Sequence, residues 1–559
     1  MLGRRKREGE DLDREPPQDE RLDRRAFLTR MSVVAAGAAV GQLPPLSLTG
    51  ARPGAPRAGR LDTSDFFGAA APASAGLQAA EPAELTIREA GALFRARELS
   101  PTELAADCLA RIERWDGVYM AFNAVPADAV RERALELDGL QPRGLLHGIP
   151  LAIKDNFYTR GVPTTANSWI YQDFVPAFDA TAVERLTAAG GIVLGKTQMG
   201  PLATTRALTP DGEITTLNAW VTHDSEVSPG GSSSGTATAV SARMAPAGIG
   251  TQTGGSITSP SLAQGLTGLK PTLGRVSLRG VIPLSYSRDH AGPLARDAAD
   301  AALLLQAMAG PDPADLRTLG LPPVPDYLAA ATPVEGDRGM ELRWPTRVGV
   351  PEGWVGAGGD EVQADRESFL LALEAIGGEL VEIALPPEWE GLTSSAMNAV
   401  RLPERSEIFL ETLRRDVRLF GVALSPWING LLLSGDEFLK GQRARVALLG
   451  LVLDRVFSSC DVVLQSGAGP MDMVGLPLIA FPIGMRERSG VAAPHGVLAA
   501  GLPFGEERLL ALASAWQAVT DWHRQRPLRL SEEEQARARP TAEKSRGRLG
   551  AGAVAELAE

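Results

Sequence analysis

The chain has 559 residues, of which 44% are hydrophobic, and its formal net charge is −12. This length can bury a large core, as one domain or as two to three smaller ones. This net negative charge does not indicate a protein that binds nucleic acid, because such proteins usually carry an excess of basic residues. The two cysteines, Cys108 and Cys460, cannot make a disulfide framework, and the apolar runs around them indicate buried free thiols.

The N-terminal segment is dominated by charged residues over its first thirty positions and then becomes apolar. Residues 23–28, Asp-Arg-Arg-Ala-Phe-Leu, precede a weakly apolar stretch at residues 31–43. This pattern resembles a twin-arginine export signal, and its apolar part, about thirteen residues, is too short to span a bilayer. We expect a signal peptide at 1–43, no stable membrane anchor, and a periplasmic or extracellular protein. A charged tail with a chance arginine pair is the alternative.

The rest of the chain divides by composition. Residues 44–83 are rich in Ala, Pro and Gly and predict a linker. Residues 84–530 carry periodic apolar patterns and predict a single folded domain, and the charged residues 531–559 predict a C-terminal tail.

Two capping boxes predict where the first helices of this domain begin. Thr86 with Glu89, and Ser100 with Glu103, each match the Ser/Thr-x-x-Glu pattern that satisfies free N–H groups at a helix start. The second helix is expected to run to about Trp115.

Short apolar runs bounded by glycine predict strands after residue 147. Helical patterns lie between them, at residues 180–189 and 295–308. Strands that alternate with helices predict an α/β fold with helices on both faces of a large, mixed, mostly parallel, twisted sheet. The predicted strands are residues 149–153, 191–194, 347–350, 461–464 and 478–481.

Two short motifs match known sites in form but lack the required context. Residues 190–197 match the phosphate-loop pattern, but their interior is strand-like, so Lys196 is expected to be a polar residue at a strand end. Residues 231–235 match the G-x-S-x-G pattern around Ser233, but no downstream histidine has a catalytic loop context. No His, Cys or Glu cluster has metal-ligand spacing, and no metal or cofactor is expected.

A serine assisted by a lysine is the remaining option for acyl transfer. Residues 228–272 hold two serine clusters in glycine-rich sequence without Cys, His, Asp or Glu, which suits chemistry by hydroxyls and backbone N–H groups. Lys154 ends the strand at 149–153, where burial would lower its pKa towards a value useful for a base. On the strand alone, a lysine that extends its ammonium group to the sheet edge is the alternative.

Several motifs in consistent order resemble the amidase signature family. The resemblance covers residues 85 to about 525, and it implies the α/β fold of the family and hydrolysis of a carbon–nitrogen amide bond through an acyl-enzyme. The motifs are GIPLAIKDN, AGGIVLGKT, GGSSSGTATA, GTQTGGSITSP, GLTGLKPTLGRVS, SYSRDHAGPLARDAADAALLL (285–305) and, more weakly, MVGLPLIAFPIG (473–484).

The same resemblance assigns the catalytic residues. Ser256 matches the nucleophile, Ser232 matches a bridging serine that follows a cis peptide bond, and Lys154 matches the base. The oxyanion hole would be formed by the backbone N–H groups of Thr253, Gly254, Gly255 and Ser256.

The chain departs from the common family pattern at two positions beside the nucleophile. Gln252 and Thr258 stand where the family usually has Asp and Arg. Because both charges are missing together, we expect a neutral hydrogen-bonded pair in place of an ion pair, and an active enzyme.

The sequence is less informative about the substrate. Residues 285–293 are similar to exported peptide amidases, which release ammonia from C-terminal amides, and aryl acylamidase or carbamate hydrolysis are alternatives. A non-catalytic binding protein on the same fold is an alternative of another class. The expected partner is a small-molecule or peptide amide, and the following residues are candidates for an apolar pocket or for ordinary core: Trp220, Met397, Trp427, Leu431 to Leu433 and Phe438.

Overall fold

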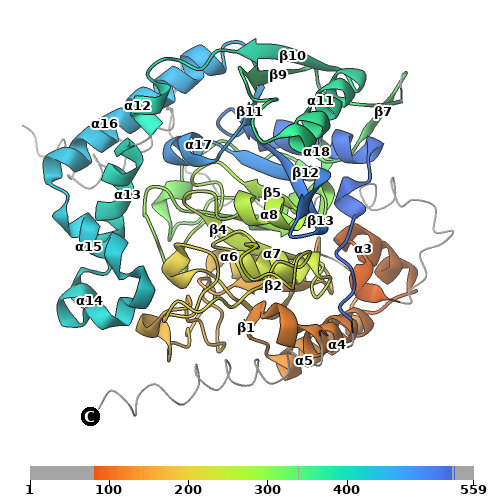
Figure 1. Cartoon of the computed structure of the whole chain (residues 1–559). Coiled ribbons are helices and arrows are strands. Elements are labelled where there is room, and N and C mark those ends of the chain that lie inside the picture. Colours follow the sequence, from red (N-terminus) through yellow and green to blue (C-terminus); the bar gives the residue numbers. More distant parts are fainter. Residues whose placement is uncertain (1–80, 143, 338, 394, 532–533, 535–559) are drawn as a thin grey trace, which may run out of the picture. The chain divides into compact units, whose positions relative to one another are not determined.

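The computed structural model describes residues 81–142, 144–337, 339–393, 395–531 and 534 (Figure 1). The predicted signal peptide lies outside these residues, as do most of the predicted linker and tail. These three predictions therefore remain predictions.

Within the described residues, eleven strands form one mixed sheet in the order β1-β3-β2-β4-β6-β5-β12-β13-β11-β9-β10, and β7 and β8 form a separate pair. All five predicted strands are present, as β2, β3, β9, β11 and β12, and β12 is longer than predicted. The strands are β1 (Phe122–Ala124), β2 (Pro150–Lys154), β3 (Ile192–Thr197), β4 (Ala247–Gln252), β5 (Thr267–Lys270), β6 (His290–Ala295), β7 (Val334–Gly336), β8 (Gly339–Glu341), β9 (Thr346–Pro351), β10 (Gly378–Ile383), β11 (Val462–Gln465), β12 (Leu478–Arg488) and β13 (Val491–Gly501).

The direction of the strands differs between regions of the sheet. Parallel pairing lies in two trios, β3-β2-β4 and β11-β9-β10. The strands between the trios, and the edge strand β1, pair in the antiparallel sense. One cause is local: Ser489 and Gly490, with φ of 47° and 81°, join β12 to β13 by a two-residue turn, which only antiparallel strands allow.

Helices cover both faces of the sheet, as predicted (Figure 1). On one face α7 packs against β2 and β4, and α8 packs against β5 and β12. On the other face α9 packs against β5 and β6, and α18 against β12 and β13. Helices α12, α13, α15 and α16 pack together beside the sheet, at the left of Figure 1.

The helices begin and end as follows. The α-helices are α3 (Ile87–Ala96), α4 (Pro101–Tyr119), α5 (Ala127–Asp138), α6 (Thr181–Ala188), α7 (Ser234–Ser241), α8 (Thr258–Gln264), α9 (Ala298–Met308), α10 (Tyr327–Ala330), α11 (Asp360–Ala375), α12 (Trp389–Thr393), α13 (Ser395–Ile408), α14 (Leu410–Arg415), α15 (Leu424–Leu432), α16 (Gly435–Leu451), α17 (Gly469–Val474) and α18 (Glu506–Val519). The short helical turns are η2 (Pro82–Glu84), η3 (Trp169–Tyr171), η4 (Pro201–Ala203), η5 (Leu316–Thr318), η6 (Val417–Ala423), η7 (Val452–Val456) and η8 (Trp522–Arg524).

Both predicted capping boxes are present. Thr86 caps α3 and Ser100 caps α4, and in each case the side chain of the glutamate three residues later bonds back to the cap N–H. The second helix continues to Tyr119, one turn beyond the predicted end. The helix starts are therefore defined by hydrogen bonds between residues close in sequence.

Both cysteines are free and fully buried, as predicted. Burial raises the pKa of Cys108 to about 12 and that of Cys460 to about 11. A thiol with so high a pKa carries almost no thiolate at neutral pH, so neither cysteine is a nucleophile.

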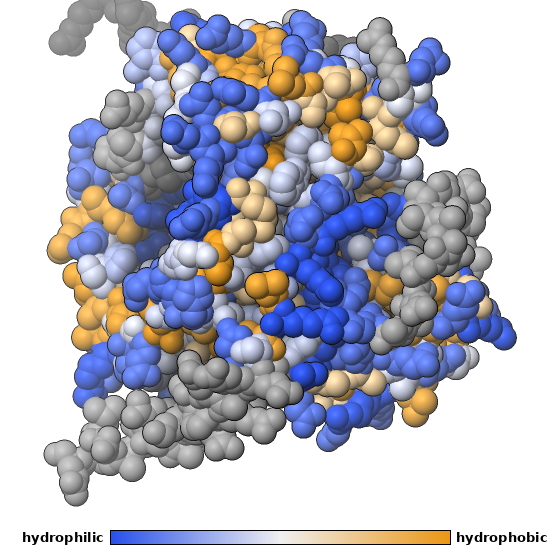
Figure 2. All heavy atoms as spheres, turned by 45° about the vertical axis from the view of Figure 1, so that its right-hand side comes forward, coloured by the Kyte–Doolittle hydropathy of each residue, from blue (hydrophilic) through white to orange (hydrophobic). Residues whose placement is uncertain are grey.

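The hydropathy of the surface and the lengths of the helices can be compared with those of a membrane-spanning protein. Figure 2 shows the face that carries the right-hand side of Figure 1, where apolar side chains gather in small groups among hydrophilic ones. Among the described helices none is long and apolar enough to cross a membrane alone. Two consecutive helical segments, Val417–Leu432 and Gly435–Val456, are long and apolar enough when taken together, but the chain bends by 96° between them.

Candidate active site

Two neighbouring parallel strands bring a lysine and a threonine together. Lys154 is the last residue of β2, which pairs with β4, and β4 carries Thr251 near its end. Lys154 is fully buried, and its Nζ atom lies 2.8 Å from Thr251 Oγ1 and 3.2 Å from the Thr251 carbonyl oxygen. The alternative of an ammonium group at an exposed sheet edge is therefore excluded.

The same Nζ atom contacts the predicted bridging serine, because Lys154 Nζ lies 2.8 Å from Ser232 Oγ. Burial lowers the pKa of Lys154 to about 7, and the nearby Asp289 carboxylate opposes this shift. A large fraction of Lys154 is therefore neutral at pH 7 and can accept a proton, as a general base requires.

Ser232 follows Gly231 through a cis peptide bond, as the resemblance implied. Only a glycine fits at position 231, since a Cβ atom there would lie 2.4 Å from the Thr205 carbonyl oxygen. Ser232 itself is fully buried, so its hydroxyl is shielded from bulk water.

Ser233, the central residue of the G-x-S-x-G match, has a structural role. Its hydroxyl donates to the Ser256 carbonyl oxygen at 2.6 Å. The α/β-hydrolase interpretation is thus excluded, and the bond brings the first serine cluster against the second.

Residues 253–256, which we call the nucleophile turn, connect β4 to α8. Gly255 adopts a φ of 106°, a value that glycine tolerates. Gly254 is exposed, and Ser256 is 9% exposed, so the turn opens outward while Ser256 stays near the core. Among the described residues no acceptor is bonded to the N–H groups of Gly254 and Ser256, whereas the N–H of Gly255 also stabilises the Asp472 carboxylate.

The pair that replaces the usual Asp and Arg is hydrogen bonded, as expected. Gln252 Oε1 accepts the Thr258 hydroxyl at 3.2 Å and the N–H groups of Ile257 and Thr258 at 2.8 and 2.9 Å. The neutral pair also contacts a charged group, because Gln252 Nε2 donates to Asp472 at 2.9 Å. Asp472 in turn lies 3.9 Å from Lys270 Nζ, so a buried charge pair from distant segments supports the turn.

Sequence reasoning missed Asp472, Lys270, Thr251 and Asn156. Asn156 donates to Thr251 Oγ1 at 3.0 Å and so orients the hydroxyl beside the lysine. The family motifs contain three of these residues, but nothing in a single sequence shows which atoms they approach.

The phosphate-loop match is structural. Lys196 is fully buried in β3, its Nζ atom lies 3.1 Å from Asp155 Oδ1, and it donates to the Phe157 carbonyl oxygen and to Thr164 Oγ1 at 2.7 and 2.6 Å. A lysine held in this way cannot reach a phosphate. Lys196 is the penultimate residue of β3, so it lies near a strand end, as the sequence predicted.

The candidates for an apolar pocket are mostly placed elsewhere. Trp220 donates to Ser241 Oγ at 3.1 Å and packs on the core, and Trp427 is fully buried. Leu431 and Leu432 are 44% and 77% exposed, so they are not core residues. The side chain of Met397 lies outside the described residues.

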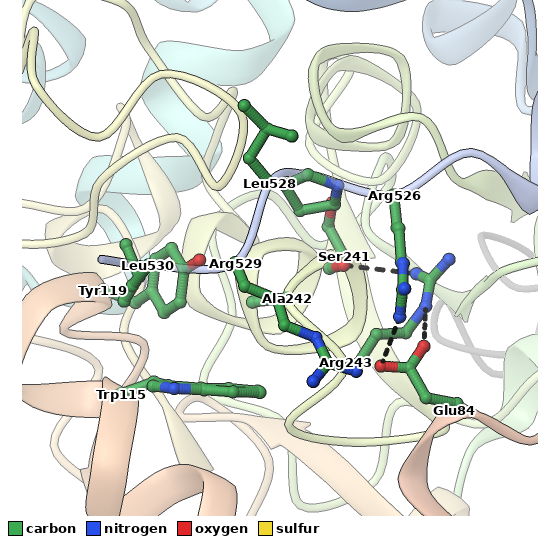
Figure 3. A pocket seen from close by; sticks show the side chains of 11 residues that line it. Glu84, Trp115, Tyr119, Ser241, Ala242, Arg243, Arg526, Leu528, Arg529 and Leu530 are labelled. Carbon is green, nitrogen blue, oxygen red and sulfur yellow. Dashed lines mark hydrogen bonds and ion pairs between the residues drawn. The ribbon is translucent and has the colours of Figure 1, made fainter. Parts of the chain in front are cut away.

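A small cavity lies at the other end of α7, beside Arg243 and the segment at residues 526–530 (Figure 3). Glu84 forms ion pairs there with Arg243 and Arg526, at 3.6 and 3.1 Å. The cavity has a volume of about 20 Å³ and includes none of the predicted catalytic residues. It is too small for an organic substrate.

Among the described residues no group of His, Cys, Asp and Glu side chains is arranged to hold a metal ion.

Comparisons with known proteins agree with the motifs. A family model described as Amidase matches residues 103–410. A glutamyl-tRNA(Gln) amidotransferase subunit from Anaeromyxobacter dehalogenans is 35% identical over 493 residues, which cover 78% of this chain and 96% of that protein.

Solved structures agree as well. Native peptide amidase from Stenotrophomonas maltophilia has a TM-score of 0.66 and 29% identity, over 78% of this chain and 96% of that one. An inhibitor-bound complex connected with the origins of an s-triazine catabolic enzyme has a TM-score of 0.68 and 26% identity, over 78% and 98% of the two chains.

The fold and these relatives define an enzyme that hydrolyses carbon–nitrogen amide bonds. The chain belongs to the amidase signature family.

Proposed function

We propose that this enzyme cleaves amides through an acyl-enzyme on Ser256, with Ser232 and Lys154 as the proton relay. The observation that supports the proposal most directly is the buried Lys154 Nζ atom 2.8 Å from Ser232 Oγ. Among the described residues no carboxylate oxygen forms an ion pair with Lys154, so hydroxyl and carbonyl groups surround a lysine whose pKa is about 7.

The relay proceeds in balanced steps. Neutral Lys154 takes the proton of Ser232, Ser232 takes the proton of Ser256, and Ser256 Oγ bonds to the amide carbonyl carbon. The protonated Lys154 then returns its proton through Ser232 to the leaving nitrogen as the C–N bond breaks. Water attacks the resulting ester by the same relay, which releases the acid and regenerates Ser256 and neutral Lys154.

The nucleophile turn would stabilise the negative oxygen of the tetrahedral intermediate. We propose Thr253, Gly254, Gly255 and Ser256 as donors, and an oxyanion donor typically contributes on the order of 10²–10³ in rate. The Gly255 N–H also faces Asp472, so the N–H groups of Gly254 and Ser256 are the stronger candidates.

For the substrate, we propose a peptide with a C-terminal amide as the first candidate. The support is the similarity of residues 285–293 to peptide amidases and the solved peptide amidase that is 29% identical. Anilides and aryl carbamates are the alternatives.

The proposal is tested by labelling the purified protein with a fluorophosphonate probe, which reacts with activated serines. We expect labelling of the wild type and none of Ser256→Ala, with the exposed and remote Ser459→Ala as a matched control that labels fully. An unlabelled wild type would contradict the serine mechanism and favour a binding protein. A panel of peptide amides, anilides and aryl carbamates then ranks the substrates by kcat/KM.

We also propose export by the twin-arginine pathway, on the pattern at residues 23–43. The test is cell fractionation of the full chain beside a variant with Arg24→Lys and Arg25→Lys. We expect the variant to be retained in the cytoplasm, and equal fractionation of the two proteins would contradict export.

A further inference from the structure

A group of arginine side chains lies beside the nucleophile turn. Arg288 is fully buried and donates from Nη2 to the Thr253 carbonyl oxygen at 2.9 Å, so it holds the backbone of the turn. Arg401, from α13, is half-buried, and its Nη1 atom is 3.7 Å from where a Cβ atom on Gly254 would be. One guanidinium group thus lies next to the backbone that we propose to bind the substrate oxyanion.

A second guanidinium group lies behind the first. Arg405, one turn further along α13, is 4% exposed and stacks over the Trp427 ring at 4.8 Å. Its Nε atom is buried without a hydrogen-bond partner. Burial and then the charge of Arg401 lower the pKa of Arg405 to about 9.

Among the described residues, neither arginine forms an ion pair. Arg401 donates to the neutral side chain of Asn398 at 2.6 Å, and Arg405 contacts the Trp427 ring. Buried or half-buried cations are normally paired, because removing the charge from water costs several kcal/mol per ion. These two are therefore exceptions that call for an anion.

The nearest carboxylates are already engaged by neutral donors. Asp289 accepts the N–H groups of Leu284 and Ser285 at 2.7 and 3.1 Å. Glu404 accepts the Ser285 hydroxyl at 2.6 Å and the Ser287 N–H at 3.1 Å. These bonds direct the two acids towards the segment at residues 284–289. The Asp289 charge opposes the burial that lowers the pKa of Arg405, but neither acid forms an ion pair with Arg401 or Arg405.

We propose that Arg401, with Arg405 behind it, binds a carboxylate carried by the amide substrate. This inference rests on the proposed function and narrows its substrate class to amides of acidic molecules. A planar guanidinium group can donate two parallel hydrogen bonds to a carboxylate, and such charge-assisted bonds are about twice as strong as neutral ones. The position beside Gly254 places the carboxylate a few bonds from the scissile carbonyl.

The first test compares two substrates that differ only in charge: N-acetylglutamate α-amide and N-acetylglutamine α-amide. Succinamic acid and succinamide form a second pair, with the carboxylate on the acyl side. A bond between a charged group and its partner contributes about 1.5–3 kcal/mol, so we expect kcat/KM for the anionic member of at least one pair to be about tenfold higher or more. A ratio of one or less in both pairs overturns the proposal.

The second test assigns the preference to Arg401. In Arg401→Gln we expect the anionic-to-neutral ratio of kcat/KM to fall by about tenfold, mainly through KM, because one charge-assisted bond is lost. Arg443→Gln, an exposed arginine on α16, is the matched control and should keep the wild-type ratio. An equal loss for both substrates in Arg401→Gln would show a purely structural role and would overturn the proposal.

A binding measurement separates this inference from the proposed function. Calorimetry on Ser256→Ala should show binding of the anionic amide that is about tenfold tighter than that of the neutral amide, and addition of Arg401→Gln should remove the difference. That result supports the carboxylate site even if the wild type hydrolyses neither amide. Equal affinity for the two amides counts against the site whatever the hydrolysis assay shows.

Discussion

Lys154 and Lys196 lie on the adjacent parallel strands β2 and β3, one register position apart, since Lys154 pairs with Thr197 and Lys196 with Ile153. Both lysines are fully buried. Burial lowers the pKa of each. Lys196 has a carboxylate partner, since its Nζ atom lies 3.1 Å from Asp155 Oδ1, whereas Lys154 has two hydroxyls and a carbonyl oxygen. Asp155 offsets part of the effect of burial on the pKa of Lys196, which remains below its usual value. The partner, and not the depth of burial, therefore makes one lysine a structural cation and the other a candidate base.

The largest expected effect comes from removing the lysine that lacks a carboxylate. Lys154→Met should lower kcat/KM by about 10²–10⁴, the usual contribution of a general base. The fold should survive, since the methionine fills the same space and leaves no carboxylate unpaired. Steady-state kinetics measure the loss of kcat/KM, and circular dichroism shows whether the fold is retained. Activity within tenfold of the wild type would exclude Lys154 as the base.

The matching change in the other lysine should act on stability. Lys196→Met leaves Asp155 buried without its cation and should lower the free energy of unfolding by about 3–5 kcal/mol. The midpoint of urea unfolding measures the loss. Lys440→Met, which breaks the exposed ion pair with Asp436, is the control and should change stability by less than about 1 kcal/mol. Equal effects of the two substitutions would contradict the comparison.

The pH dependence of catalysis sharpens the same contrast. Lys154 must be neutral to accept a proton, so kcat/KM should fall as the pH decreases below the pKa of about 7. The decrease should approach about tenfold per pH unit on the acid side. A profile from pH 5 to 9 with the neutral amide measures this limb. A flat profile down to pH 5 is not compatible with Lys154 as the base.

The smallest expected effect concerns the hydroxyl beside Lys154. Thr251→Val removes an acceptor 2.8 Å from Nζ, which disfavours the protonated lysine and lowers its pKa. The acid limb should move to lower pH by up to about one unit. Thr164→Val removes the corresponding hydroxyl beside Lys196 and should leave the limb in place. Movement of the limb in both variants would show that the shift is not specific to Lys154.

Much of this molecule could be predicted from local sequence. The strands β2 and β3 follow from short apolar runs, and the starts of α3 and α4 follow from capping boxes whose partners are three residues apart. The glycine at position 231 and the family motifs indicated the cis bond before Ser232. The antiparallel centre of the sheet was harder to predict, because the direction of a strand depends on which strand it pairs with. Only for β12 and β13 does a short turn between the two strands determine the direction locally.

The site was predictable in its residue types but not in its contacts. Gln252 and Thr258 are six positions apart, and their hydrogen bond was foreseen. The Asp472 carboxylate that Gln252 also bonds lies 220 positions away, and α13 brings its arginines to the nucleophile turn from well over a hundred positions downstream. Such pairings depend on packing, which no local pattern records.

The sequence by itself determined which groups can exchange protons here. The serine-rich stretch at residues 228–272 contains no acid, histidine or cysteine, and the family resemblance indicated Lys154 as the base of the serine mechanism that we propose. Only the tertiary structure decided which groups surround each buried lysine. Lys154 and Lys196 have similar strands and equal burial, and they differ in the partners that folding brings to the Nζ atoms: Thr251, 97 positions from Lys154, and Asp155 beside Lys196. A charge is stabilised by the atoms within a few ångströms of it, and the fold alone sets those distances.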